Sequence, residues 1–208
     1  MKRYPSIPRR LKGRRHLDTS GTRVHVFDKL DGSNLRFEWS RSEGWFRFGS
    51  RHLVLDEAHK TFGVAMQLFR EQLATPIERV ARNEGWESLI AFAEFWNEGA
   101  LGGQLHPDNP LRLTLFDVAP FKQGFLGPER FLERFGECET PRYLGVHTWD
   151  EALVKRVREG NFEGVTFEGI VGKAGDRHRV IRVKAKTQAW IDAIVRRYGD
   201  KSHELINS

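Results

Sequence analysis

The chain has 208 residues, 39% of them hydrophobic and 12% aromatic, which is enough to build a core and excludes a disordered protein. Lysine and arginine outnumber acidic residues by 34 to 28, giving a net charge of +6. This charge leaves two interpretations open: an anionic partner, with nucleic acid first, or an ordinary basic surface. Cys138 is the single cysteine, which excludes an intrachain disulfide and a cysteine-based metal site.

Membrane and export signals are missing from the residue pattern. No apolar run reaches the roughly 18 residues that a membrane span needs, and no apolar signal core follows the basic residues near Met1. We therefore expect a cytoplasmic protein, or a nuclear one in a eukaryote, with no membrane partner.

The first third of the chain predicts an arm followed by strands and helices. Residues 1–20 are polar and basic and predict an extended arm, and the domain proper would cover 21–208. Alternating apolar residues predict strands at 24–27, 35–39 and 45–48. A helical spacing of apolar residues predicts a helix within 55–73 that Pro76 ends, followed by a short helix at 77–82.

The rest of the chain alternates strands and helices, with a Gly/Pro-rich loop at 97–110. We expect strands at 89–95, 111–118, 164–172 and 179–184. Helices are expected at 127–135, 150–158 and 187–198, the last with Thr187 as its N-cap. This order predicts an α+β fold, in which antiparallel sheets are flanked by helices.

Lys29 is the most distinctive residue of the chain. It follows the apolar strand at 24–27 directly and precedes a tight Asp31-Gly32 turn within the sequence Asp-Lys-Leu-Asp-Gly-Ser-Asn. The strand and turn would hold one amine outward on a rigid base, where the glycine lets a ligand approach the backbone. Lys29 is therefore a candidate covalent nucleophile.

Polar residues recur at the ends of, or inside, the other apolar strands. A carboxylate inside an apolar strand is costly to bury unless it meets a cation, a metal or a ligand hydroxyl. A structural ion pair would explain each residue taken singly, but their recurrence favours a shared site. These residues are Arg51, Glu94, Asp117, Glu168, Lys184 and Lys186, and a strand period of two places the last two amines on one face.

In this order the residues resemble the ATP-dependent RNA ligases, which are covalent nucleotidyltransferases related to DNA ligases and mRNA capping enzymes. Lys29-Leu-Asp-Gly-Ser-Asn34 resembles the nucleotidyl-acceptor motif KxxG(S/T)N. The later motifs follow in family order from Ser50-Arg51 to Lys184-Ala-Lys186, through Phe92-Ala-Glu94-Phe, Leu115-Phe-Asp117-Val and Glu168-Gly-Ile-Val. The resemblance implies an ATP-grasp-like nucleotidyltransferase domain. Because only a short stretch follows Lys186, we expect no C-terminal oligonucleotide-binding (OB) domain.

The resemblance also implies a role for each residue toward ATP and Mg²⁺ or Mn²⁺. Phe116 would stack on adenine, Glu94 would hold the ribose, and Glu168 would bind the metal. The Asp28 backbone would contact the adenine edge, and Asn34 would orient the nucleotide. Arg51 would contact a phosphate, and Lys184 and Lys186 would bind the α-phosphate. Asp117 would only anchor nearby basic side chains.

The implied reaction has three steps and an RNA substrate. Lys29 would form lysyl-AMP, AMP would pass to a 5′-phosphate, and a 3′-hydroxyl would attack that adenylated end. Ser33-Asn34 favours RNA, whereas Asp31 is the choice of DNA ligases and capping enzymes. The alternatives are a minimal ATP-dependent DNA ligase, another lysine nucleotidyltransferase, or an inactive nucleic-acid-binding module. Either the basic arm or a protein partner would clamp the ends.

Overall fold

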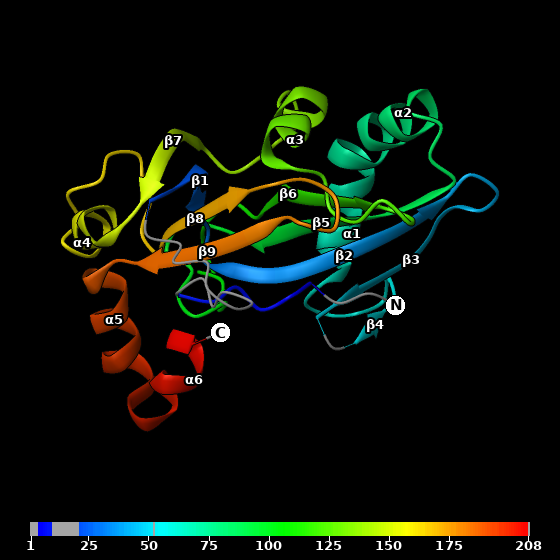
Figure 1. Cartoon of the computed structure of the whole chain (residues 1–208). Coiled ribbons are helices and arrows are strands. Elements are labelled where there is room, and N and C mark those ends of the chain that lie inside the picture. Colours follow the sequence, from blue (N-terminus) through cyan, green and yellow to red (C-terminus); the bar gives the residue numbers. More distant parts are fainter. Residues whose placement is uncertain (1–3, 10–20, 52, 208) are drawn as a thin grey trace. The chain divides into compact units, whose positions relative to one another are not determined.

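The structure is a computed structural model that describes residues 4–9, 21–51 and 53–207. The predicted arm is thus described only at 4–9, which form neither helix nor strand, and its residues 10–20 lie outside the described part. The chain divides into two compact units. Figure 1 labels their helices and strands. Unit 1 consists of Gly32–Thr140 with Tyr4 and Asp176–Arg179, and unit 2 consists of the other described residues.

Unit 1 contains an antiparallel sheet in the order β4-β3-β2-β5-β6. Strand alternation gives this sheet two chemically different faces. One face carries Leu35, Phe37 and Trp39 of β2 into the core, and the other carries Asn34 and its polar neighbours. The strands are β2 (Gly32–Ser40), β3 (Gly44–Ser50), β4 (Val54–Leu55), β5 (Ser88–Trp96) and β6 (Arg112–Pro120).

The helices of unit 1 pack against the apolar face of its sheet. They are α1 (Gly63–Leu68), a π-helical segment (Phe69–Ala74), α2 (Thr75–Asn83) and α3 (Pro128–Phe135). The prediction that Pro76 ends the helix is wrong, because helical structure continues without a break from 63 to 83. The π-helical segment directly before Pro76 widens the hydrogen-bond spacing, so the missing proline N–H is tolerated at the first turn of α2.

Unit 2 contains a second antiparallel sheet, in the order β7-β1-β8-β9. Val24, Val26 and Val183 of this sheet pack with Leu153 and Val157 of α4. The strands are β1 (Thr22–Lys29), β7 (Tyr143–Trp149), β8 (Gly169–Ala174) and β9 (Ile181–Lys186), and the helices are α4 (Glu151–Arg158), α5 (Gln188–Tyr198), a 3₁₀ turn (Gly199–Lys201) and α6 (Ser202–Asn207). The predicted α+β class with antiparallel sheets is confirmed.

Besides the helix at Pro76, two expected elements differ from the structure, and one strand was not expected. Residues 56–62 form turns and irregular structure after β4 instead of the start of a helix. β8 begins at Gly169, so Glu168 precedes this strand instead of interrupting it. β7 was not predicted because it is an edge strand whose pattern lacks buried alternation. None of the helices in the described part of the chain has the length and apolar character of a membrane span.

Candidate nucleotidyltransferase site

In unit 1, the polar face of the sheet pairs Asn34 with Glu94. These residues are directly opposite each other on β2 and β5, and Glu94 in turn lies opposite Thr114 of β6. Asn34 and Glu94 are half-buried, because the core takes their strand neighbours on the other face. An amide and a carboxylate therefore stand side by side on a rigid surface, which suits hydrogen bonding to ligand hydroxyls.

Phe116 occupies a β-bulge of β6. Asp117 pairs with Phe92 and Leu115 with the next residue, Ala93, so Phe116 is the extra residue of the irregularity. Such bulges re-aim side chains, and this one leaves Phe116 half-buried while its neighbours are buried. The ring of Phe116 is therefore placed as an aromatic surface at the edge of the sheet.

Tyr4 fixes the surroundings of Phe116, and the sequence analysis missed it. Its ring contacts Phe116 edge-on at a centroid distance of 5.0 Å and also packs against Phe92 and Phe125. Its hydroxyl donates a hydrogen bond of 2.6 Å to Asp117 Oδ2, and both residues are buried. The one signal in the sequence is an isolated aromatic residue in an otherwise polar arm.

Arg51 follows β3 and is half-buried. Its carbonyl oxygen accepts a hydrogen bond from Arg36 Nη1 at 3.3 Å, which ties the segment after β3 to β2. Arg36 itself lies on the polar face of β2, beside Asn34 along the strand. Of the predicted site residues, Asn34, Arg51, Glu94 and Phe116 belong to unit 1.

In unit 2, one buried carboxylate joins two lysines. Glu168 Oε2 accepts a hydrogen bond from Lys29 Nζ at 2.8 Å, and Glu168 Oε1 lies 3.0 Å from Lys186 Nζ. The Glu168 side chain is 4% exposed and that of Lys29 is 20% exposed. Lys29 is thus the more accessible amine, held at the end of β1 by a group that is almost closed to water.

Strand register explains why these three residues meet. Gly169 begins β8 and pairs with Lys29 on one side and with Lys186 on the other. Gly169 has φ +150°, and a Cβ there would lie 2.0 Å from the Ala185 carbonyl oxygen, so only glycine fits. This glycine, which the sequence analysis did not single out, lets Glu168 turn in between the two amines.

Lys184 and Lys186 lie buried on β9. Burial is the main cause that lowers the pKa of Lys184 from 10.5 to about 7, and the positive charges of Lys186 and Lys29 lower it further. Burial also lowers the pKa of Lys186, although the Glu168 carboxylate opposes that shift. Lys184 and Lys186 are two residues apart on the same strand, a spacing at which strand geometry directs both amines to one face.

Helix α6 supplies carbonyl acceptors to the same lysines. Lys186 Nζ donates to the Leu205 carbonyl at 3.1 Å, and Lys184 Nζ lies 3.4 Å from the Asn207 carbonyl. Arg9 donates to the Ile206 carbonyl at 2.7 Å, so three cations gather at the C-terminal end of α6. Carbonyl oxygens at a helix C-terminus attract cations, and phosphate oxygens would be alternative acceptors for these amines.

The side chains of Asp28 and Asp31 have structural partners. Asp28 accepts hydrogen bonds from the backbone N–H and the hydroxyl of Thr166, and burial raises the pKa of its carboxyl group. Its own backbone N–H donates to the Arg142 carbonyl, while the implied role toward adenine stays a prediction. Asp31 Oδ2 accepts a hydrogen bond of 2.6 Å from the indole N–H of buried Trp190.

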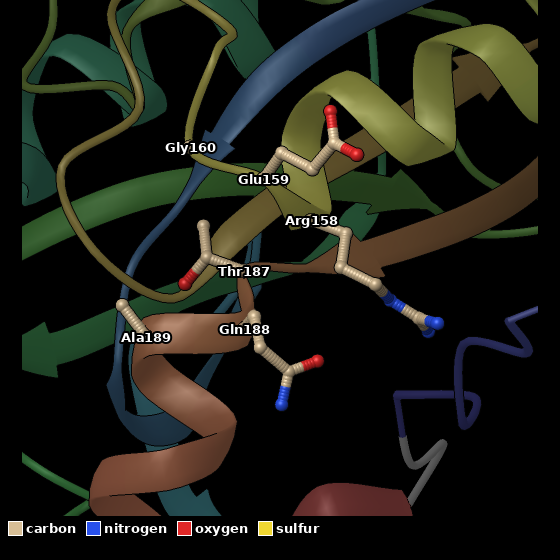
Figure 2. A pocket seen from close by; sticks show the side chains of 6 residues that line it. All are labelled: Arg158, Glu159, Gly160, Thr187, Gln188 and Ala189. Carbon is tan, nitrogen blue, oxygen red and sulfur yellow. The ribbon is translucent and has the colours of Figure 1, made fainter.

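A pocket in unit 2 is lined by residues outside the predicted site. It has a volume of about 440 Å³, and Figure 2 shows its lining at the end of α4 and the start of α5: Arg158, Glu159, Gly160, Thr187, Gln188 and Ala189. Thr187 is the N-cap of α5, as predicted, since its hydroxyl accepts from the Trp190 N–H. None of the predicted site residues lines this pocket.

A divalent cation fits the site through one carboxylate. Within residues 4–9, 21–51 and 53–207, no group of three or more His, Cys, Asp or Glu side chains forms a complete metal site. Mg²⁺ often binds through one or two carboxylates and substrate phosphates, keeping several waters. Glu168 can serve as such a ligand, and a metal there would compete with Lys29 and Lys186 for its oxygens.

Solved structures share this arrangement of elements. A Naegleria gruberi RNA ligase with AMP and Mn has a TM-score of 0.68 and 16% identity over 93% of this chain and 58% of that chain. Structures of the same ligase with ATP and Mn and with PPi have TM-scores of 0.67 and 0.65 at 16% and 15% identity. The chain has the fold of these RNA ligases. It spans 58% of their chain length, and each of the three comparisons covers 93% or more of this chain.

Two further comparisons found nothing: no family profile and no curated protein sequence matches the chain. The identity to the ligases is too low to carry residue roles across. The predicted roles therefore depend on the motif resemblance and on the geometry within each unit.

Proposed function

We propose that this chain is an ATP-dependent RNA ligase that acts through a covalent Lys29–AMP intermediate. The observation that carries the proposal is the arrangement of Lys29, Glu168 and Lys186 around Gly169. It combines an accessible amine, a buried carboxylate and a second amine with a lowered pKa, which is a setting for nucleophilic attack at phosphorus.

In the first step, Lys29 Nζ releases a proton to solvent and then attacks the α-phosphorus of ATP. The N–P bond forms as the bond from the α-phosphorus to the bridging oxygen breaks, and pyrophosphate leaves with that oxygen. Lys184 and Lys186 hold the α-phosphate oxygens, and Glu168 orients the attacking amine. A divalent cation bound at Glu168 would neutralise charge on the phosphates.

The residues of unit 1 would bind the nucleotide and the ends. Phe116 stacks on adenine, Glu94 accepts from the ribose hydroxyls, and Asn34 orients the nucleotide. Arg51 contacts the transferred phosphate or the 5′-phosphate of the RNA. AMP then passes to that 5′-phosphate, and a 3′-hydroxyl attacks the adenylated end to form the phosphodiester and release AMP.

Covalent labelling tests the first step. Incubation with ATP labelled at the α-phosphate and Mg²⁺ or Mn²⁺ is expected to label the protein, and Lys29→Ala is expected to abolish the label. Lys29→Arg is expected to fail as well, because a guanidinium group stays protonated near neutral pH. Persistent labelling of Lys29→Ala would contradict the proposal.

A matched control is available in the same unit. Lys155 is an exposed lysine whose amine lies 3.8 Å from Glu159, so Lys155→Ala also removes an amine that is paired with a glutamate. We expect full labelling of this variant. Loss of label in both variants, with both proteins folded, would indicate a general charge effect in place of a nucleophile.

Sealing assays test the substrate. Nicked duplexes with each strand as RNA or DNA separate an RNA ligase from a DNA ligase, and labelled GTP in place of ATP separates a guanylyltransferase. We expect sealing of RNA ends with a 5′-phosphate and a 3′-hydroxyl. An inactive nucleic-acid-binding module would bind these duplexes without any label on Lys29.

A further inference from the structure

Two loops of unit 1 present an exposed aromatic ring among basic side chains. Phe121 follows β6 and is 62% exposed, and Lys122 Nζ lies 5.3 Å from the centroid of its ring. The second loop lies between β8 and β9 in the chain and carries exposed Arg177, His178 and Arg179. We call residues 121–124 and 176–179 together the Phe121 surface.

The two loops of the Phe121 surface are held side by side. His178 Nε2 lies 3.1 Å from the Lys122 carbonyl oxygen, and Phe125 forms an isolated β-bridge with Arg177. A Cβ on Gly124 would lie 2.7 Å from the backbone of Arg177, so the loops approach each other as closely as glycine allows. Segments more than 50 residues apart in the chain therefore form one surface.

The backbone of the Phe121 surface is strained at its two central basic residues. Lys122 has φ 61° and Arg177 has φ 56°, and these are the non-glycine residues with positive φ in the described part of the chain. Such conformations cost free energy and persist when the surroundings enforce them, often at binding sites. Here the strained backbone sets the direction in which the side chains of Lys122 and Arg177 extend.

The charge of the Phe121 surface is positive. Its acidic residue, Asp176, accepts a hydrogen bond of 2.6 Å from the Gly127 N–H and lies 3.4 Å from Arg130 Nη1. Asp176 thus anchors the second loop to the start of α3 and has a cation of its own. Arg177 Nε lies 3.9 Å from the same carboxylate. With Lys122, Arg177 and Arg179 against one aspartate, the Phe121 surface keeps a net positive charge.

We propose that the Phe121 surface binds single-stranded RNA. A base stacks on Phe121, and backbone phosphates contact Lys122, Arg177 and Arg179. Aromatic stacking beside cationic side chains is the usual way in which single strands are bound without sequence preference. The choice of RNA rests on the proposed function, whereas labelling of Lys29 by ATP does not involve this surface.

RNA binding by the full chain tests the inference. The probe is a fluorescent single-stranded RNA oligonucleotide, and the readout is its anisotropy over a range of salt concentrations. Phe121→Ala is expected to weaken binding at least about fivefold, since stacking one base is worth that much or more. Arg177→Gln with Arg179→Gln is expected to lower the slope of log affinity against log salt by roughly 1.4, because this double variant no longer neutralises two backbone phosphates.

Phe46 provides the matched control. It is also an exposed phenylalanine of unit 1, at 41%, with the Arg47 guanidinium carbon 5.4 Å from its ring, but it lies on β3 near the other edge of the sheet. Phe46→Ala should bind RNA like the unaltered chain. Thermal unfolding of each variant verifies that the fold is retained.

The outcomes separate this inference from the proposed function. Weaker RNA binding by Phe121→Ala with unchanged Lys29 labelling supports both. If Lys29 is labelled normally but neither Phe121→Ala nor the arginine double variant changes RNA binding, the inference about the Phe121 surface is wrong and the proposed function is unaffected. If Lys29 is not labelled but RNA binding depends on Phe121, the proposed ligase function is wrong and the inference about the Phe121 surface is supported. Equal losses in Phe46→Ala and Phe121→Ala also overturn the inference.

Discussion

Lys29 Nζ and Glu168 Oε2 lie 2.8 Å apart, and the other oxygen of the same carboxylate faces Lys186. A buried carboxylate between two amines balances charge that the interior would otherwise not tolerate. The same contact orients the proposed nucleophile. Glu168 therefore links the stability of unit 2 to its proposed chemistry.

Glu168→Gln is expected to lower both stability and activity. Removing one charge of a buried pair costs about 3–5 kcal/mol, because the remaining charge is left uncompensated. We expect the free energy of unfolding, measured with denaturant, to fall by about 3 kcal/mol, and the rate of Lys29 labelling to fall as well. In the double variant with Lys186→Met the loss of stability should be smaller than the sum of the single losses, and additive losses would contradict the pairing.

The affinity for ATP is expected to depend on the protonation of Lys184. Its pKa is lowered to about 7, so the amine is charged below that pH and becomes neutral above it. A phosphate-binding lysine must be charged, so we expect the Kd for ATP to rise with pH by up to about tenfold per unit above 7. Calorimetry from about pH 7.5 to 9, above the second phosphate pKa of about 6, measures this rise.

Lys184→Arg is the control for that pH dependence, because its guanidinium group stays charged throughout. A Kd that rises equally in Lys184→Arg and in the unaltered chain would exclude Lys184 as the titrating group.

The pH dependence of stability provides a second test of the lowered pKa of Lys184. A lowered lysine pKa makes the unfolded state bind more protons between about pH 7 and 10.5, so stability should rise with pH across that window. Lys184→Met should show a smaller rise, with the remainder due to Lys186, whose pKa burial also lowers.

Asp31→Ala is expected to lower stability without changing the preference for RNA over DNA. Its carboxylate accepts a 2.6 Å hydrogen bond from buried Trp190, which ties the end of β1 to α5. Leaving the indole N–H without its acceptor should cost about 1–3 kcal/mol, measured by denaturant unfolding. The ratio of RNA to DNA sealing should stay constant, and a shift of that ratio would show that Asp31 selects the strand.

Tyr4→Phe is expected to reduce stability more than ATP affinity. The variant removes the hydroxyl that donates to buried Asp117 and keeps the ring that packs edge-on against Phe116. Loss of that hydrogen bond should cost about 1–3 kcal/mol in unfolding. Tyr4→Ala also removes the ring contact and should raise the Kd for ATP, and equal Kd values in the two variants would contradict a positioning role for the ring.

The sequence alone determined the parts of this protein that depend on local pattern. Period-two alternation predicted β2 and β3, and Thr187 and Asp150 mark the starts of α5 and α4. The order of short motifs from Lys29 to Lys186 predicted the fold that the solved RNA ligases share. These features are legible because each depends on residues close together in the chain.

Only the tertiary structure decided which distant residues meet. Glu168 lies between Lys29 and Lys186 because strand register places Gly169 between them, and register is set by pairing across the whole sheet. Pro76 continues a helix because a π-helical segment accommodates it. The partners of Tyr4 and Asp31 lie more than 80 residues away, where local pattern carries no signal, and long-range packing alone brings them together.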